Sequence, residues 1–207
     1  MEVKVVDDHI ILSGRIDGGE LPQLWSIAAQ RRANPIRTVV LRDSPGGDLL
    51  TALQVGEYIR ERGWNTAVSG YCFSGCALIY LGGKERGFTD DKPVAQTQLG
   101  FQGTYYVDTS YDRTPGSANV SGTIRARNWI KRRTDGRISD ALLERFEALP
   151  PSDLVHFFDS SRRKEAAVLV CPLGKDGKRK CVQIPGTDVY REGIANSETV
   201  IRSNDRR

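Results

Sequence analysis

Short apolar segments separated by polar turns recur along this chain, and they are most regular between residues 38 and 81. Residues 38–41 form an apolar, β-branched segment that predicts a strand, and residues 49–63 carry apolar side chains at helical spacing. A second strand is predicted over 66–69. The strand, helix and strand together predict a right-handed crossover between parallel strands. Residues 76–81 are almost wholly apolar, so we expect a helix that is buried on all sides.

The rest of the chain predicts further strands and helices around this centre. Strands are expected over 3–6, 10–13, 86–89, 96–101, 166–171 and 180–184, and helices over 20–31, 120–133 and 138–149. Residues 103–118 are a polar loop, residues 154–158 are a short strand or helical segment, and residues 203–207 are expected to fray. Gly174 and Gly177 separate the last two strands, which is typical of a β-hairpin.

Length and composition favour one compact domain over residues 1–207. With 207 residues, of which 39% are hydrophobic, the chain can bury one sizeable core. Its formal net charge is +4, and its 30 Lys and Arg residues are scattered, so we expect no nucleic-acid partner. No stretch approaches the ~18 apolar residues of a membrane-spanning helix, so we expect no transmembrane segment.

The four cysteines fall into two close pairs, Cys72 with Cys76 and Cys171 with Cys181. This spacing favours two local disulfides, of which the second would staple the C-terminal hairpin over 166–185. Metal binding is the alternative. However, Cys-x3-Cys followed much later by Cys-x9-Cys matches no common zinc spacing, and the two histidines lie far from both pairs, so no metal is expected. Disulfides predict an oxidising compartment, periplasmic or secreted.

The first residues of the chain lack the basic segment and apolar run of a signal peptide. An oxidising location then requires that Met1 stands in place of a leader that has been removed. We expect this to be the case.

Two glycine-containing turns follow successive predicted parallel strands, at the edge where open α/β sheets place their ligand sites. The first is Ser44-Pro45-Gly46-Gly47-Asp48, in which the paired glycines can leave backbone N–H groups uncovered at a helix N-terminus. Taken alone, such a turn is more often only a tight connection between a strand and a helix.

The second turn, residues 69–76, contains Ser74 and leads directly into the predicted buried helix. One interpretation makes Ser74 a helix N-cap whose hydroxyl binds the first turn. The other makes Ser74 a nucleophile beside an oxyanion hole, formed by N–H groups of Gly75 and of the turn containing Gly46 and Gly47. A disulfide between the two cysteines of this segment would bracket the serine and stiffen the turn.

Together the two turns resemble the proteolytic subunit of the Clp protease and its relatives, including signal peptide peptidase A, in the ClpP/crotonase superfamily. The resemblance rests on Ser-Pro-Gly-Gly after a β-branched strand and on Gly-x3-Ser-Gly-x-Ala before an apolar helix, and it covers residues 38–104. The Cys-x-Ser-x-Cys version looks like a group of predicted periplasmic proteins related to that subunit. The resemblance implies an α/β fold of repeated ββα units with a parallel sheet. A helical region over 118–160 and the hairpin over 166–185 would follow this core.

In that family the serine at the position of Ser74 is the nucleophile, and a histidine on a later strand is its general base. The matching string here is Leu99-Gly100-Phe101-Gln102-Gly103, so Gln102 occupies the base position. Glutamine can hydrogen-bond a hydroxyl but cannot take up its proton near neutral pH. Either Gln102 replaces a natural histidine as an inactivating substitution, or the chain is a natural degenerate relative.

The remaining histidines offer one alternative base. His156 lies in the region where the family's third triad member is found, and Asp153 is the nearest candidate for the orienting acid. The other interpretation of His156 is a half-buried structural residue. His9 belongs to the opening hairpin and is expected to be a surface or strand residue.

Three functions fit these residues. The first is a ClpP-like serine peptidase, weakened or inactive because its triad is incomplete. The second is a non-catalytic protein that binds extended peptides by strand addition. The third, less favoured, is a crotonase-type acyl-thioester enzyme, against which the Ser-Pro-Gly-Gly pattern counts. We therefore expect a peptide or protein as substrate or ligand and no cofactor, and the resemblance implies a homo-oligomer built through helices over 120–149.

Overall fold

The secondary structure follows the apolar pattern of the chain closely. The computed structural model describes residues 1–31, 33–105, 120–150, 152–172, 174 and 177–201. Its strands are β1 (Glu2–Val6), β2 (His9–Ser13), β3 (Thr38–Ser44), β4 (Asn65–Phe73), β5 (Arg86–Phe88), β6 (Gln98–Phe101), β7 (Val155–Phe158), β8 (Val168–Val170) and β9 (Val182–Gln183). Its helices are α1 (Glu20–Gln30), α2 (Leu49–Glu61), α3 (Gly75–Tyr80), α4 (Val120–Arg133) and α5 (Asp140–Glu147), and η1 (Val94–Gln96) is a 3-10 turn.

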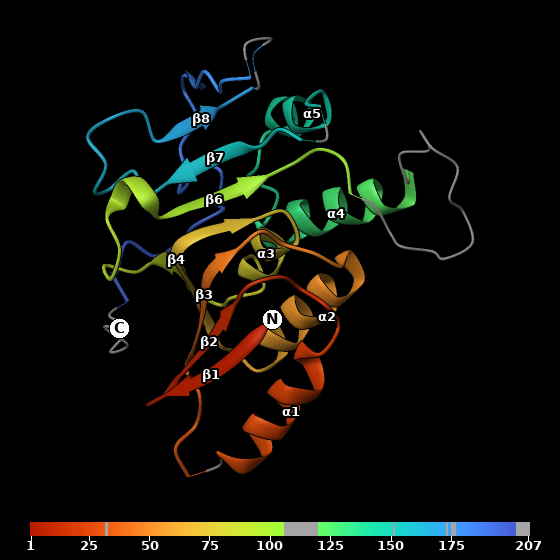
Figure 1. Cartoon of the computed structure of the whole chain (residues 1–207), viewed down its shortest axis with the longest axis vertical. Coiled ribbons are helices and arrows are strands. Elements are labelled where there is room, and N and C mark those ends of the chain that lie inside the picture. Colours follow the sequence, from red (N-terminus) through yellow and green to blue (C-terminus); the bar gives the residue numbers. More distant parts are fainter. Residues whose placement is uncertain (32, 106–119, 151, 173, 175–176, 202–207) are drawn as a thin grey trace.

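One mixed sheet runs through the molecule (Figure 1). Within the described residues it has nine strands in the order β1-β2-β3-β4-β6-β7-β8-β9, and β5 also pairs with β4. The central pairs from β2 to β6 are parallel, whereas β1, β7, β8 and β9 pair antiparallel with their neighbours. The expected parallel sheet therefore holds only at the centre. A short turn joins β1 to β2, so β1 runs antiparallel to β2. Two helices separate β6 from β7, and β7 returns antiparallel to β6. The repeated ββα units stay a prediction.

The crossover predicted for the centre is present. Strands β3 and β4 pair in parallel with Leu41 opposite Val68, and α2 connects them. Strand β4 is longer than the predicted segment over 66–69, because its last residues pair with β6. The sequence predicts a turn over residues 69–73, whereas the structure has them extended in β4. The partner strand that makes them extended lies about 25 residues further along the chain, beyond the reach of local sequence patterns.

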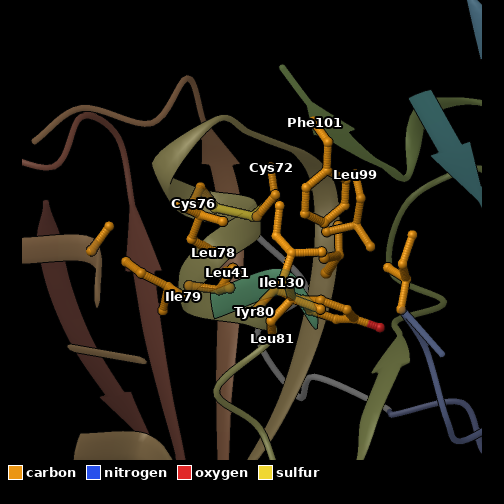
Figure 2. Close-up of a cluster of buried hydrophobic side chains, with 14 of the residues drawn as sticks. Leu41, Cys72, Cys76, Leu78, Ile79, Tyr80, Leu81, Leu99, Phe101 and Ile130 are labelled. Atoms are coloured by element: carbon orange, nitrogen blue, oxygen red, sulfur yellow. A yellow bond between two sulfur atoms is a disulfide. The ribbon is translucent and has the colours of Figure 1, made fainter. Parts of the chain in front are cut away.

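Helix α3 lies in the middle of the hydrophobic core, as its apolar sequence predicts. All six of its residues are buried. Figure 2 shows Leu78 and Ile79 of this helix among side chains of the sheet, including Leu41 and Leu99. The indole Nε1 of Trp129 on α4 donates a hydrogen bond to the backbone oxygen of Leu78 at 3.0 Å, which ties α4 to the same core. Each large aliphatic side chain buried here contributes roughly 1.5–3 kcal/mol to stability.

Both predicted disulfides are present, Cys72–Cys76 and Cys171–Cys181. The second closes the antiparallel pair β8 and β9, so the C-terminal hairpin expected over 166–185 is confirmed. Disulfides persist in oxidising environments, and two of them indicate an extracellular or periplasmic location.

Several expectations meet the limits of the described residues. Residues 106–119, which make up most of the loop expected over 103–118, lie outside them, and so do residues 202–207 at the terminus expected to fray. The interval 118–160 contains helices α4 and α5 and then strand β7, which joins the sheet. In the described part of the chain, no helix is long and apolar enough to cross a bilayer.

Candidate functional site

The predicted site residues lie where three neighbouring parallel strands end. The turn with Gly46 and Gly47 follows β3, Ser74 follows β4, and Gln102 follows β6. The arrows of these strands end close together in Figure 1, beside α3. The backbone N–H of Ser74 donates to the oxygen of Gly100 at 2.8 Å, which fixes the end of β4 against β6. The topology therefore brings both turns and the base position to one edge of the sheet.

Ser74 has an unusual backbone conformation. Its φ is 55° and its ψ is −122°, a region that residues other than glycine rarely occupy and that costs about 1–3 kcal/mol. The side chain is half-buried and makes no capping hydrogen bond to α3. The helix-cap interpretation is therefore wrong for this structure. Strain of this kind persists only where the surroundings enforce it, and it clusters at functional sites.

The Cys72–Cys76 disulfide holds the chain on both sides of Ser74. Both cysteines are fully buried, and their Cα atoms are 5.2 Å apart. Figure 2 shows the bond linking the end of β4 to the start of α3, next to Leu78. This link, with the ladder to β6, over-determines the serine's conformation.

The first glycine turn packs directly against the serine. A Cβ atom on Gly46 would lie 2.6 Å from the oxygen of Phe73 and 2.9 Å from Cβ of Ser74. Gly46 also has a φ of 91°. A side chain on Gly47, whose φ is 150°, would overlap the carbonyl oxygen of Ile16. Both positions therefore require glycine, because another residue's side chain would overlap neighbouring atoms and because φ is positive at each.

The N–H groups of the three predicted glycines are not equivalent. The N–H of Gly46 donates to Oγ of Ser44 at 3.2 Å, so it is already engaged. The N–H groups of Gly47 and Gly75 have no acceptor among the described residues. Gly75 is the first residue of α3, where a backbone N–H has no partner within the helix. Gly75 directly follows Ser74, and the oxygen of Gly47 would lie 3.5 Å from a Cβ placed on Gly75, so both unengaged N–H groups belong to residues packed around the serine turn.

Gln102 lies at the same edge, but its side chain is engaged elsewhere. Its Nε2 donates to the backbone oxygen of Thr104 at 2.7 Å. The side chain borders a small hollow whose other walls include Tyr105 and Thr123. Among the described hydrogen bonds, none joins Gln102 to Ser74. The predicted base position therefore holds a glutamine that bonds its own loop.

His156 lies near the turn that contains Ser74, but no described hydrogen bond joins it to that serine. On β7 it pairs in register with Gly100, and its ring meets that of Phe73 edge to face at 5.5 Å. Its Nδ1 is buried and has no hydrogen-bond partner among the residues that the structure describes. Burial, together with the smaller effect of the positive charge of Arg179, lowers the pKa of His156 from 6.5 to about 4. The imidazole is therefore neutral at pH 7, and no described hydrogen bond connects it to Ser74.

Asp153 pairs with a cation instead of orienting His156. It is almost completely buried and accepts a hydrogen bond from Nη1 of Arg179 at 3.0 Å. The same guanidinium donates to the backbone oxygens of Cys171 at 2.7 Å and Ser152 at 3.2 Å, which anchors the C-terminal hairpin. In a Ser-His-Asp triad a carboxylate supports the imidazolium. Here the charge that acts on His156 is positive.

His9 lies at the opposite edge of the sheet from the site. It opens β2 and pairs in register with Thr38, the first residue of β3, whereas Ser74 follows the carboxyl end of β4. Its Nδ1 is 2.7 Å from a carboxylate oxygen of Asp8. This placement agrees with the expected strand residue.

Comparison with known proteins finds similar structures but no similar sequence. No protein-family model matches the chain, and no curated protein matches it in sequence. The structure of the chain matches those of 363 solved chains. One is a mutant of ClpP1 from Listeria monocytogenes, at a TM-score of 0.53 and 12% identity, covering 97% of this chain and 94% of that one.

The fold is ClpP-like. The structural likeness spans nearly the whole chain, whereas the motifs that suggested it cover only residues 38–104. At 12% identity the comparison carries no catalytic residue over to this chain.

Within this ClpP-like fold, the sequence interpretation missed Ile16 and Glu20, which lie behind the glycine turn. Ile16 forms an isolated parallel bridge with Gly47, and Glu20 is fully buried. The available signal was weak. A lone apolar residue stands in a glycine-rich connection, Gly14 to Gly19, that precedes α1. Glycines that flank a single apolar residue are typical of a chain that must approach another backbone closely.

Proposed function

We propose that this protein is a ClpP-like member of the serine hydrolase class, located in the periplasm or secreted, with Ser74 as its nucleophile. Its ligand is an extended peptide, and its catalytic power is weakened because Gln102 stands at the base position. The observation that carries the proposal is the strained conformation of Ser74 beside the two unengaged N–H groups of Gly47 and Gly75. Strain retained next to preorganised donors is typical of a nucleophile turn.

The reaction that this geometry supports is acyl transfer. Oγ of Ser74 would form a bond to the peptide carbonyl carbon, and the oxyanion would accept hydrogen bonds from Gly47 and Gly75. The C–N bond would then break, the leaving amine would take the hydroxyl proton, and water would release the acyl group. Gln102 at the base position cannot move that proton efficiently, since a glutamine is not a base at neutral pH. An oxyanion hole and binding alone leave about 10³- to 10⁴-fold catalysis over water.

A second candidate is a peptide-binding protein without catalysis. The hydrogen bond from Gln102 to Thr104 favours it, because this side chain is occupied in its own loop. Such a protein would hold an extended peptide at the sheet edge through backbone hydrogen bonds. Peptide affinity that is unchanged in Ser74→Ala, together with no covalent capture of the serine, would support this candidate.

The test is covalent labelling by a fluorophosphonate probe. In this reaction an Oγ–P bond forms while fluoride leaves with the serine proton. We expect slow labelling of the unchanged chain, fast labelling of Gln102→His, and none of Ser74→Ala. If Gln102→His is labelled no more than Ser74→Ala while both remain folded, the hydrolase proposal is wrong and the binding candidate takes its place.

A further inference from the structure

The connection between β2 and α1 passes directly behind the glycine turn. The N–H of Ile16 donates to the oxygen of Gly46 at 2.9 Å, and the oxygen of Ile16 accepts from the N–H of Asp48 at 3.3 Å. These two bonds make up the bridge between Ile16 and Gly47. They clamp the peptide units on both sides of Gly47 and leave its own N–H unused. The orientation of that N–H therefore depends on the position of Ile16.

The side chain of Ile16 reaches the second donor. Ile16 is only 1% exposed. Its Cδ1 would be 3.1 Å from a Cβ placed on Gly75, and its Cβ would be 2.9 Å from one placed on Gly47. One residue thus contacts both glycines whose N–H groups are unengaged, the first mainly through its backbone and the second through its side chain.

A buried carboxylate holds this connection in place. Glu20 is fully buried, and its two oxygens accept the N–H groups of Asp17 and Gly18, each at 3.0 Å. A buried charge is tolerated only when it is bonded in this way. The residues that follow Ile16 are therefore fixed by a strong set of hydrogen bonds.

We infer that Ile16 is a positioning residue for the oxyanion hole, and that Glu20 secures it there. The inference rests on the proposed function, because it concerns the donors that would bind the oxyanion. Such donors must lie 2.7–3.1 Å from the oxyanion, and a misplacement of about 1 Å can cost 100-fold in rate. Ile16 contacts both Gly47 and Gly75, so a change in its size should alter the placement of these two donors.

A matched pair of variants tests the inference. Ile59 on α2 is also fully buried, but it packs in the core away from the turn. In the Gln102→His background, Ile16→Val and Ile59→Val each remove one methylene and should lower Tm by roughly 2–4 °C. Only Ile16→Val should slow fluorophosphonate labelling, by about tenfold. Equal labelling rates in the two variants would overturn the inference.

A second matched pair of variants tests whether Glu20 secures Ile16. Glu192 is a buried carboxylate that accepts the N–H of Ser139 at 2.8 Å, at the start of α5. Glu20→Gln and Glu192→Gln should both lower Tm, and only Glu20→Gln should slow labelling. If Glu192→Gln slows it as much, the effect follows general stability and the inference is wrong.

Backbone amide spectra separate this inference from the proposed function. If Gln102→His is not labelled at all, the proposed function fails, and the ¹H–¹⁵N signals of Gly47 and Gly75 decide the positioning. Shifts of both signals in Ile16→Val, larger than in Ile59→Val, would support it. Signals that do not move would overturn it.

Discussion

The two disulfides of this protein enclose regions of opposite character. Cys72 and Cys76 are fully buried and bracket the strained Ser74, whereas Cys181 is exposed and its bond to Cys171 closes a surface hairpin. Their sequence separations, 4 and 10, give similar unfolded-state stabilisation of about 2 and about 3 kcal/mol. Stability alone therefore does not distinguish them. The first preserves a local geometry, and the second holds a small hairpin that has little core of its own.

Removing each disulfide in turn should give the largest measured difference between the two regions. Replacement of both cysteines by alanine should cost about 2–5 kcal/mol at either bond. In the Gln102→His background, the Cys72 and Cys76 pair should in addition lose at least about tenfold in labelling rate, because Ser74 is released from its strained conformation. The Cys171 and Cys181 pair should label at the parent rate. Equal losses of labelling would mean that the first disulfide has no special relation to the serine.

Lowering the pH should destabilise the protein at His156, which lies between the two disulfide-containing regions. His156 contacts Phe73 beside the first disulfide, and Arg179 of the hairpin lowers its pKa. The pKa falls from its ordinary value of 6.5 to about 4, chiefly through burial. The folded state therefore binds the proton more weakly than the unfolded chain does. Above pH 6.5 the histidine is neutral in both states and the free energy of unfolding is at its full value. As the pH falls from 6.5 towards 4, the free energy of unfolding decreases by about 3 kcal/mol.

Urea unfolding between pH 7 and pH 4 measures this effect. His156→Phe keeps an aromatic ring against Phe73 and removes the titrating imidazole, so the dependence of its unfolding free energy on pH should be flatter by that amount. An unchanged profile in His156→Phe would assign the acid sensitivity to other groups.

Two glycines with positive φ provide a smaller, matched contrast. Gly46 has a φ of 91°, and a Cβ there would lie 2.6 Å from the oxygen of Phe73. Gly177, in the hairpin, has a φ of 73°, and no described residue lies within 4 Å of a Cβ placed on it. Gly177→Ala should cost about 1–2 kcal/mol from backbone strain alone. Gly46→Ala should cost more and should also abolish labelling of Gln102→His. Thermal unfolding and labelling check both, and similar losses in the two variants would contradict the close packing at Gly46.

The smallest effect concerns access to the two disulfides. Under native conditions with dithiothreitol and iodoacetamide, the exposed Cys181 should be alkylated together with Cys171 long before Cys72 or Cys76. The buried pair should react only as the protein unfolds. Mass spectrometry of peptides over time follows each pair, and early modification of Cys72 would show that the turn containing Ser74 opens locally.

Much of the centre of this fold follows from local patterns. The helical spacing of α2, the apolar run of α3 and the close cysteine pairs each depend on neighbours in sequence, so they could be predicted. The extension of β4 through Phe73 could not, because it depends on pairing with β6. The antiparallel direction of β7 likewise follows from the path of α4 and α5.

The site was predictable in its residue types more than in its hydrogen bonds. Glycine turns and the serine are visible in the sequence. The sequence did not reveal that the N–H of Gly46 bonds Ser44 while that of Gly47 stays unengaged. Nor does spacing reveal that Asp153 pairs with Arg179, since 26 residues separate them. Such pairings are decided by tertiary packing.

The most direct test of the central claim is ¹¹B NMR of a peptide boronic acid bound to the unchanged chain. The boron accepts an electron pair from Oγ of Ser74 while the hydroxyl proton passes to solvent, and the resulting anionic tetrahedral boronate presents an oxygen to the N–H groups of Gly47 and Gly75. We predict a tetrahedral boron signal in the unchanged chain and in Gln102→His, and its loss in Ser74→Ala. A boron that stays trigonal in all three folded proteins would contradict the claim that Ser74 is a nucleophile beside a preformed oxyanion hole.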